Sequence, residues 1–256
     1  MNQNATAGPN LTGVAAAPQR SQEMLTGMEE FPPSSEGSAE DLALVRIAYA
    51  KEAEPLGSVP LLVHAKGRGK SAAKALKGEQ LLLFMDKLGE RLAFERTGTR
   101  LYEALVSKHD AFGGFTGGPS REALEHIRQE EYQHFTLLQS VIEQLDGDPT
   151  AVTPSANLHG TAAHGINQVI VDPRTTLLQS LEAILMAELA DNACWEALIE
   201  PAQEAGEDAL VMQFEEALRN EQDHLAKVQT WLAAGQGRSH NSRGNGKGQG
   251  RSKTRS

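Results

Sequence analysis

The stretches EEYQHF, residues 130–135, and NEQDHL, residues 220–225, decide how this chain is interpreted. Each contains a glutamate followed three residues later by a histidine, Glu131 with His134 and Glu221 with His224. Residues three apart on an α-helix project from the same face, so each pair can bind one ligand together. Such pairs also arise by chance, so their meaning depends on the residues that lie opposite them.

The sequence has four long stretches of helical periodicity, over about residues 78–110, 119–145, 172–206 and 207–234. The two pairs lie in the second and the fourth of these stretches. Apolar residues recur in each stretch at spacings of three and four, which is typical of helices packed in a bundle. A glutamate interrupts each apolar stripe midway. In chain order these are Glu95, Glu131, Glu188 and Glu221.

The connections between these stretches predict how the helices are joined. The first and last connections are short, which places consecutive helices side by side and antiparallel. The middle connection takes about 25 residues, which is long enough to run the length of a bundle. The sequence therefore predicts an all-α fold, an antiparallel four-helix bundle with a long crossover between the second and third helices. Pro201 predicts a kink or break near the end of the third helix.

Four glutamates at the same level of a bundle core would repel one another strongly. A buried glutamate needs a partner or a metal ion, because desolvating an unpaired charge is costly. Two divalent cations would neutralise four carboxylates. Carboxylate oxygens together with imidazole nitrogens suit iron, manganese or zinc. The pattern therefore predicts a metal site formed by the four glutamates with His134 and His224.

Four motifs carry a family resemblance: FERTGTRLY (94–102), QEEYQH (129–134), MAELAD (186–191) and RNEQDH (219–224). In this order they resemble the metal-binding helices of the ferritin-like superfamily, within it the rubrerythrin-like di-iron carboxylate branch. The resemblance covers residues 78–234 and implies two Fe ions, with Mn as the alternative. It implies that Glu131 and Glu221 bridge the metals, that Glu95 and Glu188 are more terminal ligands, and that each histidine binds one metal.

The chain departs from that branch in two ways. It has one cysteine, Cys194, which excludes the Cys-rich rubredoxin-type domain of complete rubrerythrins. Asp191 stands where the branch has a second glutamate on the third helix, and its shorter side chain leaves its role as a ligand open. Cys194 itself is expected to be an inert, small apolar residue. His159 and His164 lie beside glycines in the crossover and are expected at the surface, with a second metal site as the alternative.

The resemblance implies an enzyme that oxidises Fe(II) or reduces O2 or H2O2, in a ferroxidase-like or peroxidase-like reaction. Manganese would imply catalase-like chemistry. Tyr102 is a candidate redox-active residue, or else a core tyrosine bonded to a carboxylate. Two further hypotheses stay open: an oxygenase that hydroxylates an organic or RNA substrate, and a non-catalytic metal-binding or cargo bundle recruited through its tails.

The ends of the chain differ from its centre in composition. Residues 1–36 are predicted to be disordered, residues 37–77 to form a short helix at about 38–53 followed by a basic linker, and residues 235–256 to form a disordered tail. That tail carries six Lys or Arg and no acidic residue, while the rest of the chain has a net charge of −16. We expect any partner of the tail to be acidic. The short helix at about 38–53 is expected to support a homodimer.

Neither a membrane span nor a convincing signal peptide is predicted. Apolar runs stay well below the roughly 18 residues that a span requires. The N-terminal segment has neither a basic start nor an apolar core, which argues against a signal peptide. A single cysteine fits a reducing compartment. A cytoplasmic location is therefore expected.

Overall fold

The computed structural model describes residues 14–32, 34, 37–54 and 79–237. The chain divides into two units, residues 1–55 and 56–256, which are described separately below. In the described residues all regular structure is helical, in eight helices without a strand. None of these helices combines the length and apolar character needed to span a membrane. The basic linker at 66–77 and the tail from residue 238 lie outside the described residues.

The first unit contains helices α1 (Pro18–Glu30) and α2 (Ala39–Glu52). Helix α2 confirms the predicted short helix. It begins with a capping box, in which Asp41 N donates to Ser38 Oγ at 3.0 Å and Ser38 N donates to Asp41 Oδ2 at 3.1 Å. Helix α1 occupies thirteen residues of the segment for which disorder is expected. Proline in its first turn and helix-forming residues favour it, and none of its side chains is buried.

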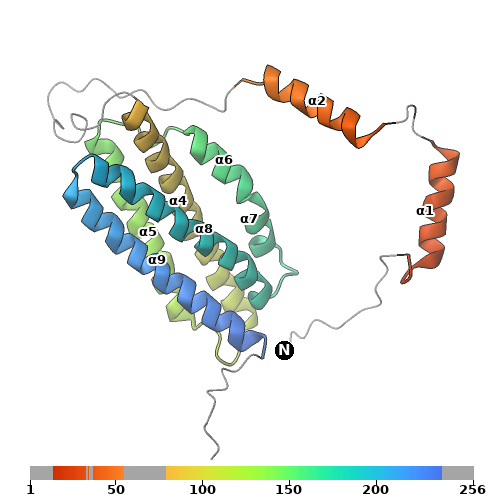
Figure 1. Ribbon diagram of the computed structural model, residues 1–256. Helices are drawn as coiled ribbons and strands as arrows, with labels where there is room; N and C mark the ends of the chain where they lie inside the picture. The colour runs from red at the N-terminus through yellow and green to blue at the C-terminus, as the bar shows by residue number, and fades with distance from the viewer. Residues whose placement is uncertain (1–13, 33, 35–36, 55–78, 238–256) are drawn as a thin grey trace, which may run out of the picture. The chain divides into compact units, whose positions relative to one another are not determined.

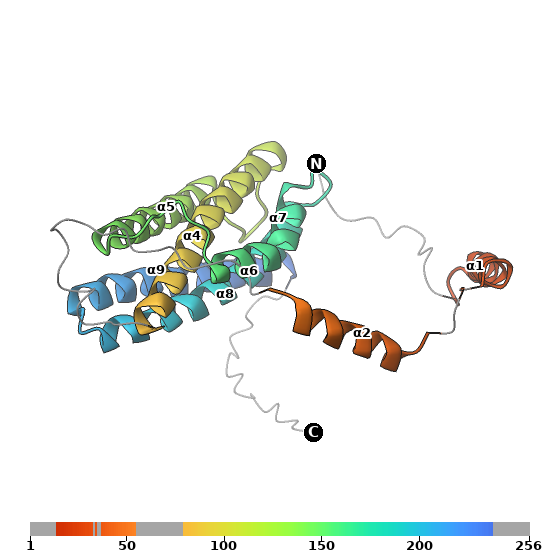
Figure 2. The same ribbon diagram turned by 90° about the horizontal axis from the view of Figure 1, so that it is seen from above.

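Four long helices form the framework of the second unit (Figures 1 and 2). They pack in pairs, as in a helical bundle: α4 packs on α5, α8 packs on α9, and α4 lies along α8. Their ends agree with the predicted helices to within about five residues. Their bounds are α4 (Glu79–Phe112), α5 (Arg121–Gln144), α8 (Leu177–Glu204) and α9 (Asp208–Gly235).

Helix α8 differs from its predicted extent at the start and passes through its proline near the end. It begins at Leu177 rather than at residue 172, because Thr176 caps it by accepting a hydrogen bond from Gln179 N at 3.2 Å. Asp172 instead forms a turn, accepting a hydrogen bond from Arg174 N at 2.9 Å. The helix continues past Pro201 to Glu204, and Gly206 then adopts a φ of 69°, which glycine tolerates without strain.

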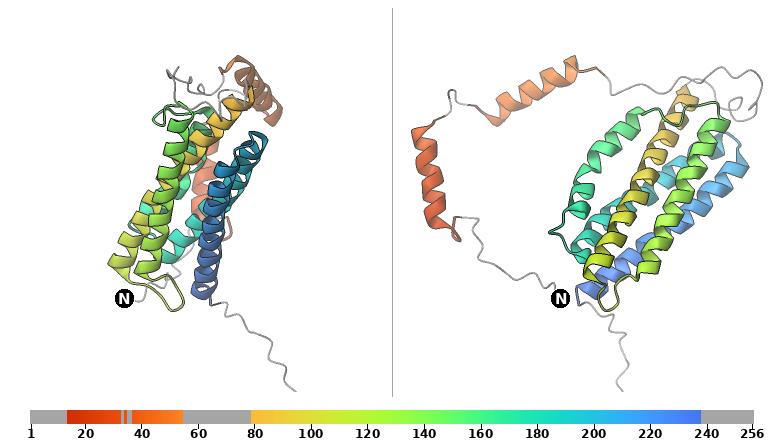
Figure 3. Two further views of the ribbon diagram at one scale, coloured as in Figure 1. Left: turned by 90° about the vertical axis from the view of Figure 1, so that its left-hand side faces the viewer. Right: turned by 180° about the vertical axis from the view of Figure 1, so that it is seen from behind.

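The long crossover is itself helical. It contains α6 (Pro154–Ala162) and α7 (His164–Val171), which pack along α4, and α7 also packs on α8 (Figure 3). Asp86 of α4 holds the start of α6, because its carboxylate accepts hydrogen bonds from Ser155 N at 2.9 Å and Ser155 Oγ at 2.6 Å. Each of these helices is too short to show a clear period in the sequence, so the crossover was predicted only as a connection.

The buried apolar side chains form two clusters, one toward each end of the bundle. The first includes Leu88, Leu138, Trp195 and Phe214. The second includes Leu105, Ile127, Leu181 and Val228. On each long helix the interrupting glutamate lies between the two clusters. The fold therefore places a layer of polar side chains in the middle of an apolar core.

Candidate metal centre

All eight residues that the sequence selected are buried in this middle layer. Their exposed fractions lie between 0% and 4%. All four long helices contribute to the set, which consists of Glu95, Tyr102, Glu131, His134, Glu188, Asp191, Glu221 and His224. The predicted phases of the four helical stripes are therefore confirmed.

The possible ligand atoms gather into two neighbouring groups that meet at Glu221. In one group, atoms of Glu131, Glu188, Glu221 and His224 lie within 4.8 Å of one another. In the other, atoms of Glu95, His134 and Glu221 do so. A third combination joins Glu95 and Glu131 with Asp191 and Glu221. Buried carboxylate and imidazole groups could thus hold metal ions at two adjacent positions.

Both histidines direct Nδ1 toward the carboxylates. His134 Nδ1 lies 2.7 Å from Glu221 Oε1, and His224 Nδ1 lies 3.1 Å from Glu221 Oε2. Polar partners contact the outer Nε2 atoms: Glu130 Oε2 lies 3.0 Å from His224 Nε2, and Asn220 Nδ2 lies 3.3 Å from His134 Nε2. Such contacts orient a ligating imidazole and select its tautomer.

Glu130 and Asn220 therefore occupy equivalent positions. Each immediately precedes a central glutamate and contacts the histidine of the opposite helix. Neither residue is among the predicted site residues, although Glu130 begins EEYQHF and Asn220 begins NEQDHL. The doubled acid in EEYQHF was the available signal.

Three of the four glutamates have a buried oxygen without a hydrogen-bond partner, and the corresponding oxygen of Glu221 is paired only with His134 Nδ1 at 2.7 Å. The atoms are Glu95 Oε2, Glu131 Oε2, Glu188 Oε2 and Glu221 Oε1. Leaving a buried acceptor unsatisfied costs about 1–3 kcal/mol, and more when the group is charged. A cation among these oxygens would be a partner for all four. Hard carboxylate oxygens with two imidazole nitrogens fit iron or manganese as donors, so the residues present fit a two-metal centre.

The pKa values of the buried carboxyl groups indicate the same need for positive charge. Burial, together with the charge of Glu221, raises the pKa of Glu188 to about 8 and raises that of Glu131 well above its ordinary value. Burial alone would also raise the pKa of Glu221, but the two histidines lower it to about 2. Protons on some of these groups therefore stand in for cations when the centre holds no metal.

Arg91 is a buried cation that the sequence interpretation missed. It lies on α4, donates from Nη2 to Glu95 Oε1 at 3.0 Å, and pairs with Asp191 of α8. Its guanidinium also lies 4.6 Å from the centroid of the Phe94 ring, which is a favourable cation–π distance. Its position four residues before Glu95 was the sequence signal.

The pairing with Arg91 bears on the open role of Asp191. Asp191 reaches the cluster, but the guanidinium is already its partner. When all are ionised, the five buried carboxylates and one guanidinium leave four negative charges in the layer. Two divalent cations would neutralise this charge with Asp191 acting as the counter-ion of Arg91.

Tyr102 is a buried tyrosine bonded to a carboxylate. Its hydroxyl donates to Glu188 Oε1, and its ring centroid lies 6.4 Å from that of His224. Burial, reinforced by the negative charge of Glu188, raises its pKa well above the ordinary value. Tyr102 therefore stays protonated and fixes one oxygen of Glu188, while the other oxygen of Glu188 has no partner.

Comparison of the chain with known protein families, with characterised proteins and with solved structures gives no match. The class of the protein is therefore defined by its own geometry. It is an all-α helical protein with buried clusters of carboxylates and histidines that could hold metal ions.

Proposed function

We propose that residues 79–235 form a ferritin-like bundle that binds two iron ions and oxidises Fe(II) or reduces O2 or H2O2. One observation carries the proposal: four helices each bring a buried glutamate to one layer of the core, and three of these glutamates have an oxygen without a hydrogen-bond partner. The ligand set of one glutamate from each of two helices, with Glu-x-x-His from each of the other two, is that of di-iron carboxylate bundles.

The proposed ligand roles follow the two groups of atoms. Glu221 takes part in both groups, and Glu131 takes part in the combination with Glu95, so these two glutamates are assigned as bridges. Glu95 with His134, and Glu188 with His224, complete the two positions. Two iron ions bound there would together donate two electrons to an oxidant, one electron from each ion.

The chain's own residues would prepare the site for this chemistry. The apolar clusters on either side of the polar layer exclude water from it. Tyr102 and Arg91 each hold one oxygen of a terminal glutamate, Glu188 and Glu95 respectively. The second oxygen of each terminal glutamate stays available to a cation. Glu130 and Asn220 keep both imidazoles facing the carboxylates.

Manganese remains the alternative metal, since the same donors suit it. An oxygenase would need a substrate pocket beside the metals. A cavity of about 180 Å³ lies between α4 and the crossover, but none of the six ligand residues lines it. That cavity therefore does not favour the oxygenase hypothesis. The cargo hypothesis, the acidic partner and the homodimer remain proposals about the tails and the first unit.

The test is metal content after anaerobic loading of the full chain with Fe(II) and separately with Mn(II), followed by exposure to O2 and to H2O2. We expect the bundle centre to bind about two ions, and near-ultraviolet absorption of oxidised iron to appear with one oxidant faster than with the other. A wild-type protein that retains no iron at this centre would overturn the proposal.

Glu221→Ala is the decisive variant, because Glu221 belongs to both groups. We expect it to lose the second ion and Fe(II) oxidation while circular dichroism shows unchanged helix content. Glu216→Ala is the matched control, since Glu216 is exposed on the same helix. Retention of two ions by Glu221→Ala would show that the ligand assignment is wrong.

A further inference from the structure

A second group of metal-ligand side chains lies outside the bundle centre. Glu90 of α4, His159 of α6 and Cys194 of α8 bring one possible ligand atom each to within 4.8 Å of one another. None of the three belongs to the candidate centre above, and they come from three different helices. Their side chains are a carboxylate, an imidazole and the only thiol of the chain.

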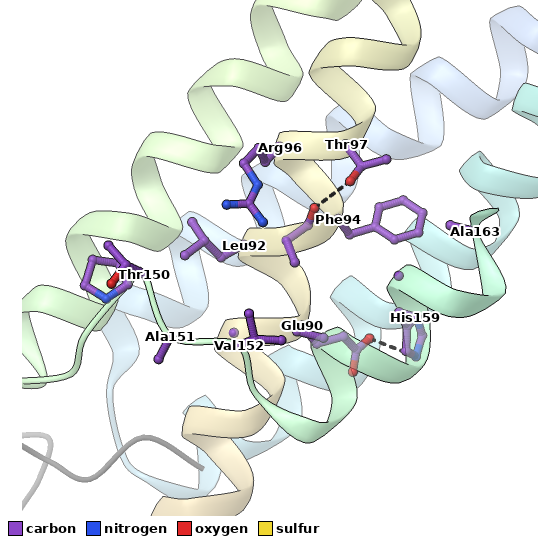
Figure 4. A pocket seen from close by; sticks show the side chains of 15 residues that line it. Glu90, Leu92, Phe94, Arg96, Thr97, Thr150, Ala151, Val152, His159 and Ala163 are labelled. Carbon is purple, nitrogen blue, oxygen red and sulfur yellow. Dashed lines mark hydrogen bonds and ion pairs between the residues drawn. The ribbon is translucent and has the colours of Figure 1, made fainter. Parts of the chain in front are cut away.

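Glu90 is the buried member of the group, with 1% of its surface exposed. Its two oxygens have separate partners: Lys87 Nζ lies 2.7 Å from Oε2, and His159 Nε2 lies 3.4 Å from Oε1 (Figure 4). Oε1 is thus directed at the histidine and is available as a single ligand atom. The ammonium of Lys87 remains on the other oxygen, where it holds the carboxylate in place.

The fold fixes His159 over Glu90 through the start of α6. Thr153 Oγ1 donates to the Asp86 carbonyl oxygen at 3.0 Å, and this contact is close because Gly89 has no side chain. A Cβ on Gly89 would lie 2.8 Å from Thr153 Oγ1. The anchor at Asp86 lies one turn before Glu90, so the position of α6 is set independently of the histidine.

The group borders the cavity described above, and this provides room for solvent ligands. Glu90 and His159 both line its wall, together with Gly89, Thr97 and Ala156 (Figure 4). Its volume of about 180 Å³ exceeds the roughly 30 Å³ share of one water molecule. A cation held by three side chains could therefore complete a tetrahedral shell with water, as open zinc sites do.

We propose that Glu90, His159 and Cys194 bind one divalent cation of the zinc type. A thiolate and an imidazole favour borderline metals over Mg²⁺ or Ca²⁺, which prefer oxygen ligands. The thiolate and the carboxylate together balance the charge of the cation. The proposal does not depend on the iron centre, since the two sites share no residue.

The chain has a single cysteine, so Cys194 can be followed without ambiguity. The first experiment titrates the full chain with Co²⁺, which gives a near-ultraviolet charge-transfer band only when a thiolate binds it. The second measures alkylation of Cys194 by iodoacetamide with and without Zn²⁺. We expect the band to appear, and Zn²⁺ to slow alkylation by more than about 10-fold because the attacking thiolate is then bound.

His159→Ala should weaken Co²⁺ binding at this site by more than the roughly 10- to 100-fold that follows loss of an outer-shell contact. Cys194→Ser should abolish the band. His164→Ala is the control, because His164 is exposed and contacts Gln168 instead.

Glu221→Ala must keep the charge-transfer band even though it damages the bundle centre, which separates failure of this proposal from failure of the iron proposal. The inference would be overturned if wild type gave no thiolate band and no protection by Zn²⁺. Unchanged Co²⁺ affinity in His159→Ala would also overturn it.

Discussion

Gly98 of α4 lies against the carboxylate of Glu131, and this contact depends on the missing side chain. A Cβ on Gly98 would lie 2.8 Å from Glu131 Cδ and closer still to Oε2. Oε2 is also the atom of Glu131 that has no hydrogen-bond partner. The small residue therefore provides the space that the carboxylate of Glu131 occupies.

Gly98→Ala should displace Glu131 and weaken iron binding. Overpacking a buried site typically lowers the free energy of unfolding by about 1–3 kcal/mol, whereas Gly→Ala inside a helix otherwise gains up to about 1 kcal/mol. Urea unfolding of the metal-free protein and metal content after Fe(II) loading measure the two effects. Gly165→Ala is the control, because no atom lies within 4 Å of its added Cβ. Full iron loading of Gly98→Ala would contradict the assigned position of Glu131.

Much of the candidate centre could be predicted at the residue level. Helical periodicity places Glu95, Glu131, Glu188 and Glu221 on the buried stripes, and the i, i+3 spacing adds both histidines. The i, i+4 spacing of Arg91 and Glu95 is visible in the sequence. The contacts of Arg91, Glu130 and Asn220 with residues of other helices are not. Pairing across helices depends on rotation and register, which one sequence does not specify.

At the level of elements, the four long helices were predictable because each is long and periodic, while α6 and α7 were not. Ile166 and Ile170 of α7 pack into the second apolar cluster, and the start of the crossover is held to α4 by tertiary contacts of Asp86. Those contacts join residues 67 to 69 positions apart in the chain. The second group of ligands was not predicted for the same reason, since His159 reaches Glu90 through the packing of α6 on α4, and Cys194 through the packing of α8 on α4.

Asp86→Ala should loosen the docking of α6. Its carboxylate accepts two hydrogen bonds from Ser155, and loss of hydrogen bonds to a charged group costs about 1.5–3 kcal/mol. We expect the free energy of unfolding to fall by that amount. We also expect a weaker Co²⁺–thiolate band, because His159 is no longer held over Glu90. Chemical denaturation and the Co²⁺ titration test this. Asp148→Ala is the control, since the carboxylate of Asp148 bonds only to nearby Thr150. An equal effect in both variants would refute a role of Asp86 in docking.

At the level of the whole molecule, the metal-free bundle contains more buried carboxyl groups than can be ionised together at neutral pH. Glu188 has a folded pKa of about 8 against an ordinary 4.5, because burial and Glu221 favour its neutral form. His134 has a folded pKa of about 10 against 6.5, because Glu221 and Glu95 outweigh the effect of burial. Between about pH 6 and pH 10 the folded state therefore binds more protons than the unfolded chain, so its stability falls as pH rises.

The metal-loaded protein should respond in the opposite direction, because metal binding requires deprotonated ligands and is lost on acidification. After chelation, we expect the free energy of unfolding to fall by about 6 kcal/mol from pH 6 to pH 9, with Glu188 and His134 each contributing about half of this loss. After loading with Fe(II) under anaerobic conditions, it should hold steady or rise over the same range. Urea unfolding at both pH values, with and without metal, measures the difference. A metal-free protein that is more stable at pH 9 than at pH 6 would mean that the carboxylates are ionised without cations, which would remove the electrostatic reason for two metals in the core.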